Sequence, residues 1–188
     1  EDAMAVAFKP TTSKVEQMLI QAVVKDGEKV IFRDVKDENS GQTYNLTVAQ
    51  YIAYDLGSDN LGFSNELYTK ILQEAVEHCG EEGFKAEEYF TQHADIEISS
   101  VAVRLSVDRF QLAESLQVKE TEQTLRDCVI HLVADFRLEY LSSYLKELET
   151  RLSQEKDSEK MKEIMGEIMR KRNLRNELAK KTGTNILV

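Results

Sequence analysis

The sequence contains few residues that interrupt helices, with one proline and eight glycines among its 188 residues. This scarcity disfavours a turn-rich all-β fold and favours long helices. Hydrophobic residues make up 41% of the chain and charged residues 31%, so a sizeable core can form and general disorder is not expected. The composition therefore predicts an ordered, mainly helical protein.

The chain also lacks the features of membrane-spanning and secreted proteins. It contains no run of about 18 apolar residues, and its N-terminal EDAMAVAFKP has no apolar core of the kind found in secretory signals. Cys79 and Cys128 stand far apart and suggest no disulfide framework. The isolated cysteines predict a reducing, cytoplasmic setting. Because the chain begins at Glu1 without an initiator methionine, we expect a piece of a longer protein.

Charge is distributed unevenly along the chain. The net charge of −10 argues against broad nucleic-acid binding, which depends on basic residues. Residues 125–188 hold 13 basic and 11 acidic residues, a net of +2, which leaves 11 basic and 23 acidic residues, a net of −12, in residues 1–124. An acidic body followed by a near-neutral tail indicates two functionally distinct parts.

The first segment is predicted to be a linker followed by a helix. Residues 1–12 form the linker, and apolar residues at helical spacing predict a helix from Thr12 or Ser13 onwards. Gly27 is expected to end this helix in a left-handed cap.

The next segment has β-forming composition. Residues 29–32 and 43–46 favour strands, and turn-forming residues at 38–41 separate them. They predict a small β-hairpin near 29–46, with an ordered loop as the alternative.

Capping signals then mark further helices. Thr47 and Gln50 are spaced as a capping box for a helix that Gly57 is expected to stop. Ser64 is expected to cap the following helix, which ends near Gly80.

Two shorter segments complete the predicted bundle of residues 13–119. The first lies at 86–93. The second, 96–107, fits both an alternating strand and a buried helix, and we predict a helix because its neighbours are helical.

The last part of the chain, residues 120–188, predicts a long helical hairpin. Apolar residues recur in steps of three and four over roughly 30 residues without Gly or Pro, which gives a helix of about 45 Å. Asp157 or Ser158 is expected to cap a second helix that reaches about Lys181 and stops at Gly183. The predicted fold class is thus all-α, a helical bundle followed by a long antiparallel helical hairpin.

Residues suited to catalysis or metal binding are sparse. Cys128 and His131 share a helix face but supply two ligands, where a closed zinc site needs four. The ordinary interpretation is a half-buried histidine beside a core thiol. The sequence Gly80-Glu81-Glu82-Gly83 lacks the Lys-Ser/Thr that a phosphate-binding loop requires. We therefore expect no catalytic, cofactor-binding or metal-binding residues.

The second hairpin helix carries the best candidate for a partner-binding surface. Methionines recur there every four residues, next to two isoleucines, Ile164 and Ile168, and this apolar strip is wider than one partner helix requires. Simple packing inside the hairpin carries equal weight. A basic run follows the strip, and the chain ends on apolar residues. The candidate partner-binding residues are Met161, Met165, Ile168, Met169, Arg172, Arg175, Ile186, Leu187 and Val188.

The hairpin sequence also resembles a known family. HLVADFRLEYLSSYLKELETRL followed by MKEIMGEIMRKRNLRNELAKKTG resembles the terminal hairpin of bacterial DnaG-type DNA primases. EQMLIQAVV resembles the first helix of their preceding bundle, and FSNELYTKILQEAVEHCGEEGFKAEEYFTQHADIEISSVAVRLS resembles the next helices. The resemblance covers residues 13–183, and 28–46 has the character of an insertion.

This resemblance implies a non-catalytic domain that binds the replicative DNA helicase of the DnaB type. Such a domain recruits primase to the fork for RNA primer synthesis and modulates the helicase, while the zinc-binding and catalytic domains lie upstream. It also implies contact with the acidic tail of single-stranded-DNA-binding protein, for which no residues are named. No direct nucleic-acid or membrane binding is expected, and two copies could pair through their hairpins.

Three other interpretations compete with this one. The first is a helical adaptor or assembly module of another system. The second is a helical enzyme, which would require carboxylates facing one another inside the bundle. The third is the N-terminal domain of the helicase itself, which shares the bundle but continues into an ATPase.

Overall fold

The computed structural model describes residues 13–36, 41–107 and 121–181. These residues belong to two compact units, one extending to Val133 and the other starting at Ala134, so that the division falls within one long helix. The predicted boundary between residues 119 and 120 and the predicted linker, 1–12, lie outside the described residues. Among the described residues, no helix is long and apolar enough to cross a membrane.

The described residues are mainly helical and contain one antiparallel pair of strands, which confirms the predicted fold class. The helix predicted for 96–107 is also confirmed. The elements are α1 (Lys14–Asp26), β1 (Val30–Lys36), β2 (Thr43–Thr47), α2 (Val48–Ser58), α3 (Glu66–His78), α4 (Ala86–Thr91), α5 (Ile96–Val107), α6 (Glu122–Gln154) and α7 (Ser158–Lys181).

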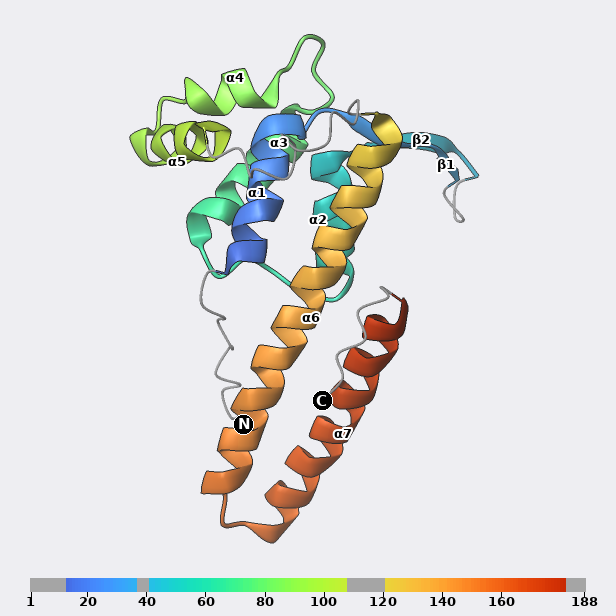
Figure 1. Cartoon of the computed structure of the whole chain (residues 1–188), viewed down its shortest axis with the longest axis vertical. Coiled ribbons are helices and arrows are strands. Elements are labelled where there is room, and N and C mark those ends of the chain that lie inside the picture. Colours follow the sequence, from blue (N-terminus) through green and yellow to red (C-terminus); the bar gives the residue numbers. More distant parts are fainter. Residues whose placement is uncertain (1–12, 37–40, 108–120, 182–188) are drawn as a thin grey trace, which may run out of the picture. The chain divides into compact units, whose positions relative to one another are not determined.

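Helix α1 is central to the first unit, where it contacts α2, α3, α4 and α5 (Figure 1). Its apolar side chains recur at helical spacing, and Leu19, Ile20, Val23 and Val24 are fully buried. Burial of each such side chain stabilises the fold by about 1.5–3 kcal/mol. The bundle core is therefore built around one face of α1.

The ends of α1 are fixed by different means. Ser13 forms the N-terminal capping box, since its Oγ accepts a hydrogen bond of 3.1 Å from the backbone N–H of Glu16. The predicted left-handed cap at Gly27 is wrong, because Gly27 has φ −54°. Glycine is needed there for space: a Cβ would collide with the carbonyl oxygen of Val23 and lie 3.4 Å from Cβ of Ala86.

The predicted stop of α2 at Gly57 is also wrong, because the helix continues to Ser58. Asn60, with φ 53°, takes the left-handed position instead. Its N–H donates to the Gly57 carbonyl at 3.2 Å, and the N–H of Leu61 donates to the Leu56 carbonyl at 2.9 Å. This pair of hydrogen bonds is the Schellman arrangement that ends helices.

The β-hairpin forms as predicted and packs on neighbouring helices of the first unit. Phe32 on β1 lies 5.0 Å from the ring of Tyr51 on α2, and the guanidinium of Arg126 on α6 lies 5.8 Å from the Phe32 ring centre. Arg33 donates from Nε to both oxygens of the Glu122 carboxylate and from Nη2 to one of them, the last hydrogen bond being the shortest at 2.7 Å. The hairpin thus contacts both α2 and the first turns of α6.

The second unit is an antiparallel pair made by the C-terminal part of α6 and by α7, which runs back alongside it (Figure 1). Helix α6 has 33 residues, a length of about 50 Å. Asp157 caps α7, as predicted: its Oδ1 accepts from the N–H groups of Glu159 at 2.9 Å and Lys160 at 3.3 Å. Gly183, the predicted stop, lies outside the described residues.

Candidate partner-binding surface

The apolar strip predicted on α7 divides into an inner and an outer face. Ile164 and Ile168 retain 8% and 7% of their accessible surface and form a core with Leu145 and Leu148 of α6. Tyr144 and Leu152 pack against the same core. Ile168, a predicted binding residue, therefore lies inside the hairpin core, where it packs between α7 and α6 and is not available to a partner.

The methionines face outward. Met165 is 53% exposed and Met169 is 66% exposed, while Met161 is partly buried. Four residues separate Met165 from Met169, so they lie one turn apart on the same face of α7. Unbranched thioether side chains adapt to varied partner surfaces, and exposed apolar side chains that gather in one place mark such surfaces.

Basic side chains border the methionines. Arg172 lies three residues after Met169, and its Nη2 donates to Oε1 of Glu149 on α6 at 2.9 Å. Both side chains of this ion pair are 52% exposed. Exposed pairs contribute only about 0–1 kcal/mol, so a carboxylate of a partner can replace Glu149 at little cost. Arg175 is partly buried and lies one turn further along.

Tyr144 joins the two hairpin helices through a contact that the sequence did not predict. Its hydroxyl donates to Oε1 of Glu167 on α7 at 2.7 Å, and Nζ of Lys171 lies 5.7 Å from its ring centre. Burial, followed by the hydrogen bond to Glu167, raises the pKa of Tyr144 to about 12. The contact fixes α7 beside α6 and thereby orients the methionine face.

The structure leaves several predicted residues apart from this surface. Ile186, Leu187 and Val188 lie outside the described residues. Cys128 and His131 are both exposed on α6, which corrects the expectation of a half-buried histidine beside a core thiol. Within 13–36, 41–107 and 121–181, no group of three or more His, Cys, Asp or Glu side chains is placed to hold a metal ion.

A second polar cluster, in the bundle, was missed by sequence reasoning. His93 lies with Nε2 2.9 Å from Oε2 of Glu74, and the Tyr89 hydroxyl donates to the same oxygen at 3.2 Å. A second histidine of this cluster, His78, places Nδ1 2.8 Å from Oε1 of Glu81. Burial and then the nearby Glu74 raise the pKa of Tyr89. These residues come from α3, α4 and their connections, and their spacing in the sequence gave no signal.

The chain matches the family described as "Domain of unknown function (DUF8430)" over residues 5–186. It belongs to this family. The matched range runs from before α1 to beyond α7, so both compact units and the β-hairpin lie within it. No curated protein and no solved structure matches the chain.

Proposed function

We propose that this chain is the helicase-binding domain of a bacterial DnaG-type DNA primase, acting in the cytoplasm without catalytic activity of its own. In this role it binds the replicative DNA helicase, recruits the primase for RNA primer synthesis and modulates the helicase. The observation that carries the proposal is the exposure of Met165 and Met169 above a hairpin core that Ile164 and Ile168 already fill.

The energetics of the exposed methionines support this proposal. The hairpin core is complete without the two methionines, so their side chains contribute little to folding where they stand. Exposed apolar surface is costly in water, and a partner that covers it recovers about 25 cal/mol per Å². Because Arg172 lies beside the methionines, a partner surface that covers them should carry carboxylates next to its own apolar patch.

The arrangement of elements also supports the proposal. A small bundle, α1–α5, precedes one long helix that continues into a terminal hairpin, which is the layout the resemblance implies. We assign the binding of the helicase to the hairpin and the modulation of the helicase to the bundle. Contact with the tail of single-stranded-DNA-binding protein belongs to the same proposal, with no residues assigned.

The test is calorimetric binding of the chain to the replicative helicase of the same organism. The double variant Met165→Ser/Met169→Ser is expected to bind about tenfold to hundredfold more weakly, because two apolar contacts are lost. Leu174→Ser is the matched control: Leu174 is 50% exposed on α7, and nine residues after Met165 it faces the opposite side of the helix.

Each outcome has a distinct meaning. Weak binding by the methionine variant alone supports the proposed surface. Equal weakening by Leu174→Ser contradicts the placement of the surface but not the partner. No complex with the helicase, from a folded chain, overturns the primase proposal and favours a helical adaptor of another system. Sedimentation of the free chain shows whether two copies pair through their hairpins.

A further inference from the structure

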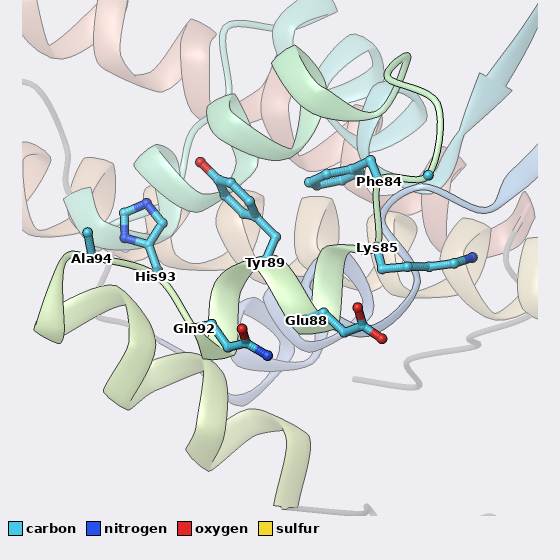
Figure 2. A pocket seen from close by; sticks show the side chains of 8 residues that line it. Phe84, Lys85, Glu88, Tyr89, Gln92, His93 and Ala94 are labelled. Atoms are coloured by element: carbon cyan, nitrogen blue, oxygen red, sulfur yellow. The ribbon is translucent and has the colours of Figure 1, made fainter.

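A groove beside α4 has the features of a second binding site. It has a volume of about 510 Å³ and lies in the first unit, over the turn that precedes α4 and the residues that follow it (Figure 2). The residues that matter for its chemistry are Phe84, Lys85, Glu88, Tyr89, Gln92 and His93.

Aromatic rings form part of the groove wall. The rings of Phe84 and Tyr89 lie 5.4 Å apart at 59°, and those of Tyr89 and His93 lie 5.4 Å apart at 66°. The Tyr89 hydroxyl and Nε2 of His93 both bind Glu74, which engages their polar atoms away from the groove. These side chains therefore offer the groove mainly their rings, whose faces carry partial negative charge.

The surroundings of the groove are strongly acidic. Residues 74–97 hold eight acidic residues and one basic residue, Lys85. Nζ of Lys85 lies 3.6 Å from Oε1 of Glu28, so this cation is already paired. Glu88, by contrast, is exposed on the groove, and within the described part of the chain no cation pairs with its carboxylate. The site therefore favours a positively charged group.

We propose that this groove binds an arginine side chain presented by a basic segment of a partner protein. A guanidinium is planar and stacks on aromatic faces, which suits the rings of Phe84 and Tyr89. Its N–H groups form a fork that reaches a carboxylate and a neighbouring carbonyl together, here those of Glu88 and Gln92. A lysine ammonium supplies the charge but lacks the plane and the fork. This proposal is independent of helicase binding by α7.

The test uses the whole chain, labelled with ¹⁵N, and three acetylated and amidated tripeptides: Gly-Arg-Gly, Gly-Lys-Gly and Gly-Glu-Gly. Backbone amide shifts are followed by NMR at constant low ionic strength. The arginine peptide is expected to shift amides in residues 83–94, and the lysine peptide is expected to bind about threefold more weakly because it stacks less well. The glutamate peptide is expected to shift none of them.

Two neighbouring carboxylates give a matched pair of variants. Glu88→Gln is expected to weaken binding of the arginine peptide about fivefold, since it removes a charge within the groove. Glu87→Gln removes the same charge from an adjacent exposed residue that does not line the groove, and is expected to change binding less than about twofold. The same spectra report whether each variant is folded.

Three results would overturn the proposal. Equal weakening by the two variants would mean that diffuse charge, and not the groove, attracts the peptide. Equal affinity for the arginine and lysine peptides would remove the stacking argument. An arginine peptide that shifts no amide in residues 83–94 would mean that the groove does not bind it.

Discussion

The Glu16 carboxylate and the Ser64 hydroxyl, 48 residues apart in the chain, lie 2.7 Å apart. The other carboxylate oxygen of Glu16 accepts from the backbone N–H of Asn65 at 3.2 Å. Glu16 also reaches back to the N–H of Ser13 in the capping box of α1. One carboxylate, only 1% exposed, thereby joins the first turn of α1 to the residues that precede α3.

Replacing this carboxylate is expected to destabilise the bundle. Glu16→Ala removes the hydrogen bonds that the Ser64 hydroxyl and the Asn65 N–H donate to the carboxylate, and each hydrogen bond to a charged group contributes about 1.5–3 kcal/mol. We expect a loss of about 2–4 kcal/mol in the free energy of unfolding, measured by urea denaturation. Glu87→Gln, at an exposed residue, is the control. A loss below about 0.5 kcal/mol would mean that solvent reaches these groups in the folded protein.

The two corrected glycines give opposite predictions for the same substitution. Gly57→Ala is expected to stabilise the protein by about 0.5–1 kcal/mol, because Gly57 lies within α2 and a Cβ there meets no atom within 4 Å apart from its chain neighbours and the adjoining backbone of α2. Gly27→Ala is expected to destabilise it by about 1–3 kcal/mol, because its Cβ would collide with the Val23 carbonyl oxygen in a buried position. Thermal unfolding of the two variants should move in opposite directions, and a shared direction contradicts the packing at Gly27.

Local signals in the sequence were sufficient for most helices but not for all of their ends. The capping box of Thr47 and Gln50 involves residues three apart, so its pattern alone located the start of α2. For α1 the apolar spacing left Thr12 and Ser13 as alternatives, and the structure shows Ser13 as the cap. Ser64 and Asn65 are both good capping residues. Asn65 caps α3, with Oδ1 accepting from the N–H of Leu67 at 2.9 Å, while Ser64 binds Glu16. The choice depends on a residue 48 positions away, which no local rule includes.

The candidate surface on α7, like the helix ends, was predicted only in part from the sequence. Helical spacing identified the strip of methionines and isoleucines on α7 but not which of them face α6. That division depends on Leu145 and Leu148, which take up Ile164 and Ile168. The groove beside α4 could not be predicted, because its charges resemble those of any solvated helix. Only the fold brings the rings of Phe84, Tyr89 and His93 together beside these charged side chains.

The two faces of α7 should respond differently to truncation. Ile168→Ala removes a buried side chain from the hairpin core and is expected to cost about 2–4 kcal/mol. Met165→Ala, at a residue that is 53% exposed, should change stability by less than about 0.5 kcal/mol. Circular dichroism during urea denaturation measures both. Similar losses for the two variants would mean that Met165 packs inside the folded hairpin.

The hydrogen bond between Tyr144 and Glu167 should make the stability of the hairpin depend on alkaline pH. The pKa of Tyr144 is raised from 10.0 to about 12, first by burial and then by this hydrogen bond. Below pH 10 the phenol is protonated in both the folded and the unfolded chain, so its stabilising contribution is fully present. Between about pH 10 and 12 the unfolded chain ionises first, and the contribution is lost as pH rises.

Tyr144→Phe removes this ionisation together with the hydrogen bond. Ultraviolet titration of the unmodified chain should show a tyrosine that ionises near pH 12, and this step should be absent from the variant. The stability lost between pH 10 and 12 should shrink in the same variant. Tyr54→Phe, at a tyrosine that is 69% exposed, is the control and should retain the step. If the step near pH 12 persists in Tyr144→Phe, the high pKa belongs to another tyrosine, and the proposed link between α6 and α7 loses its support.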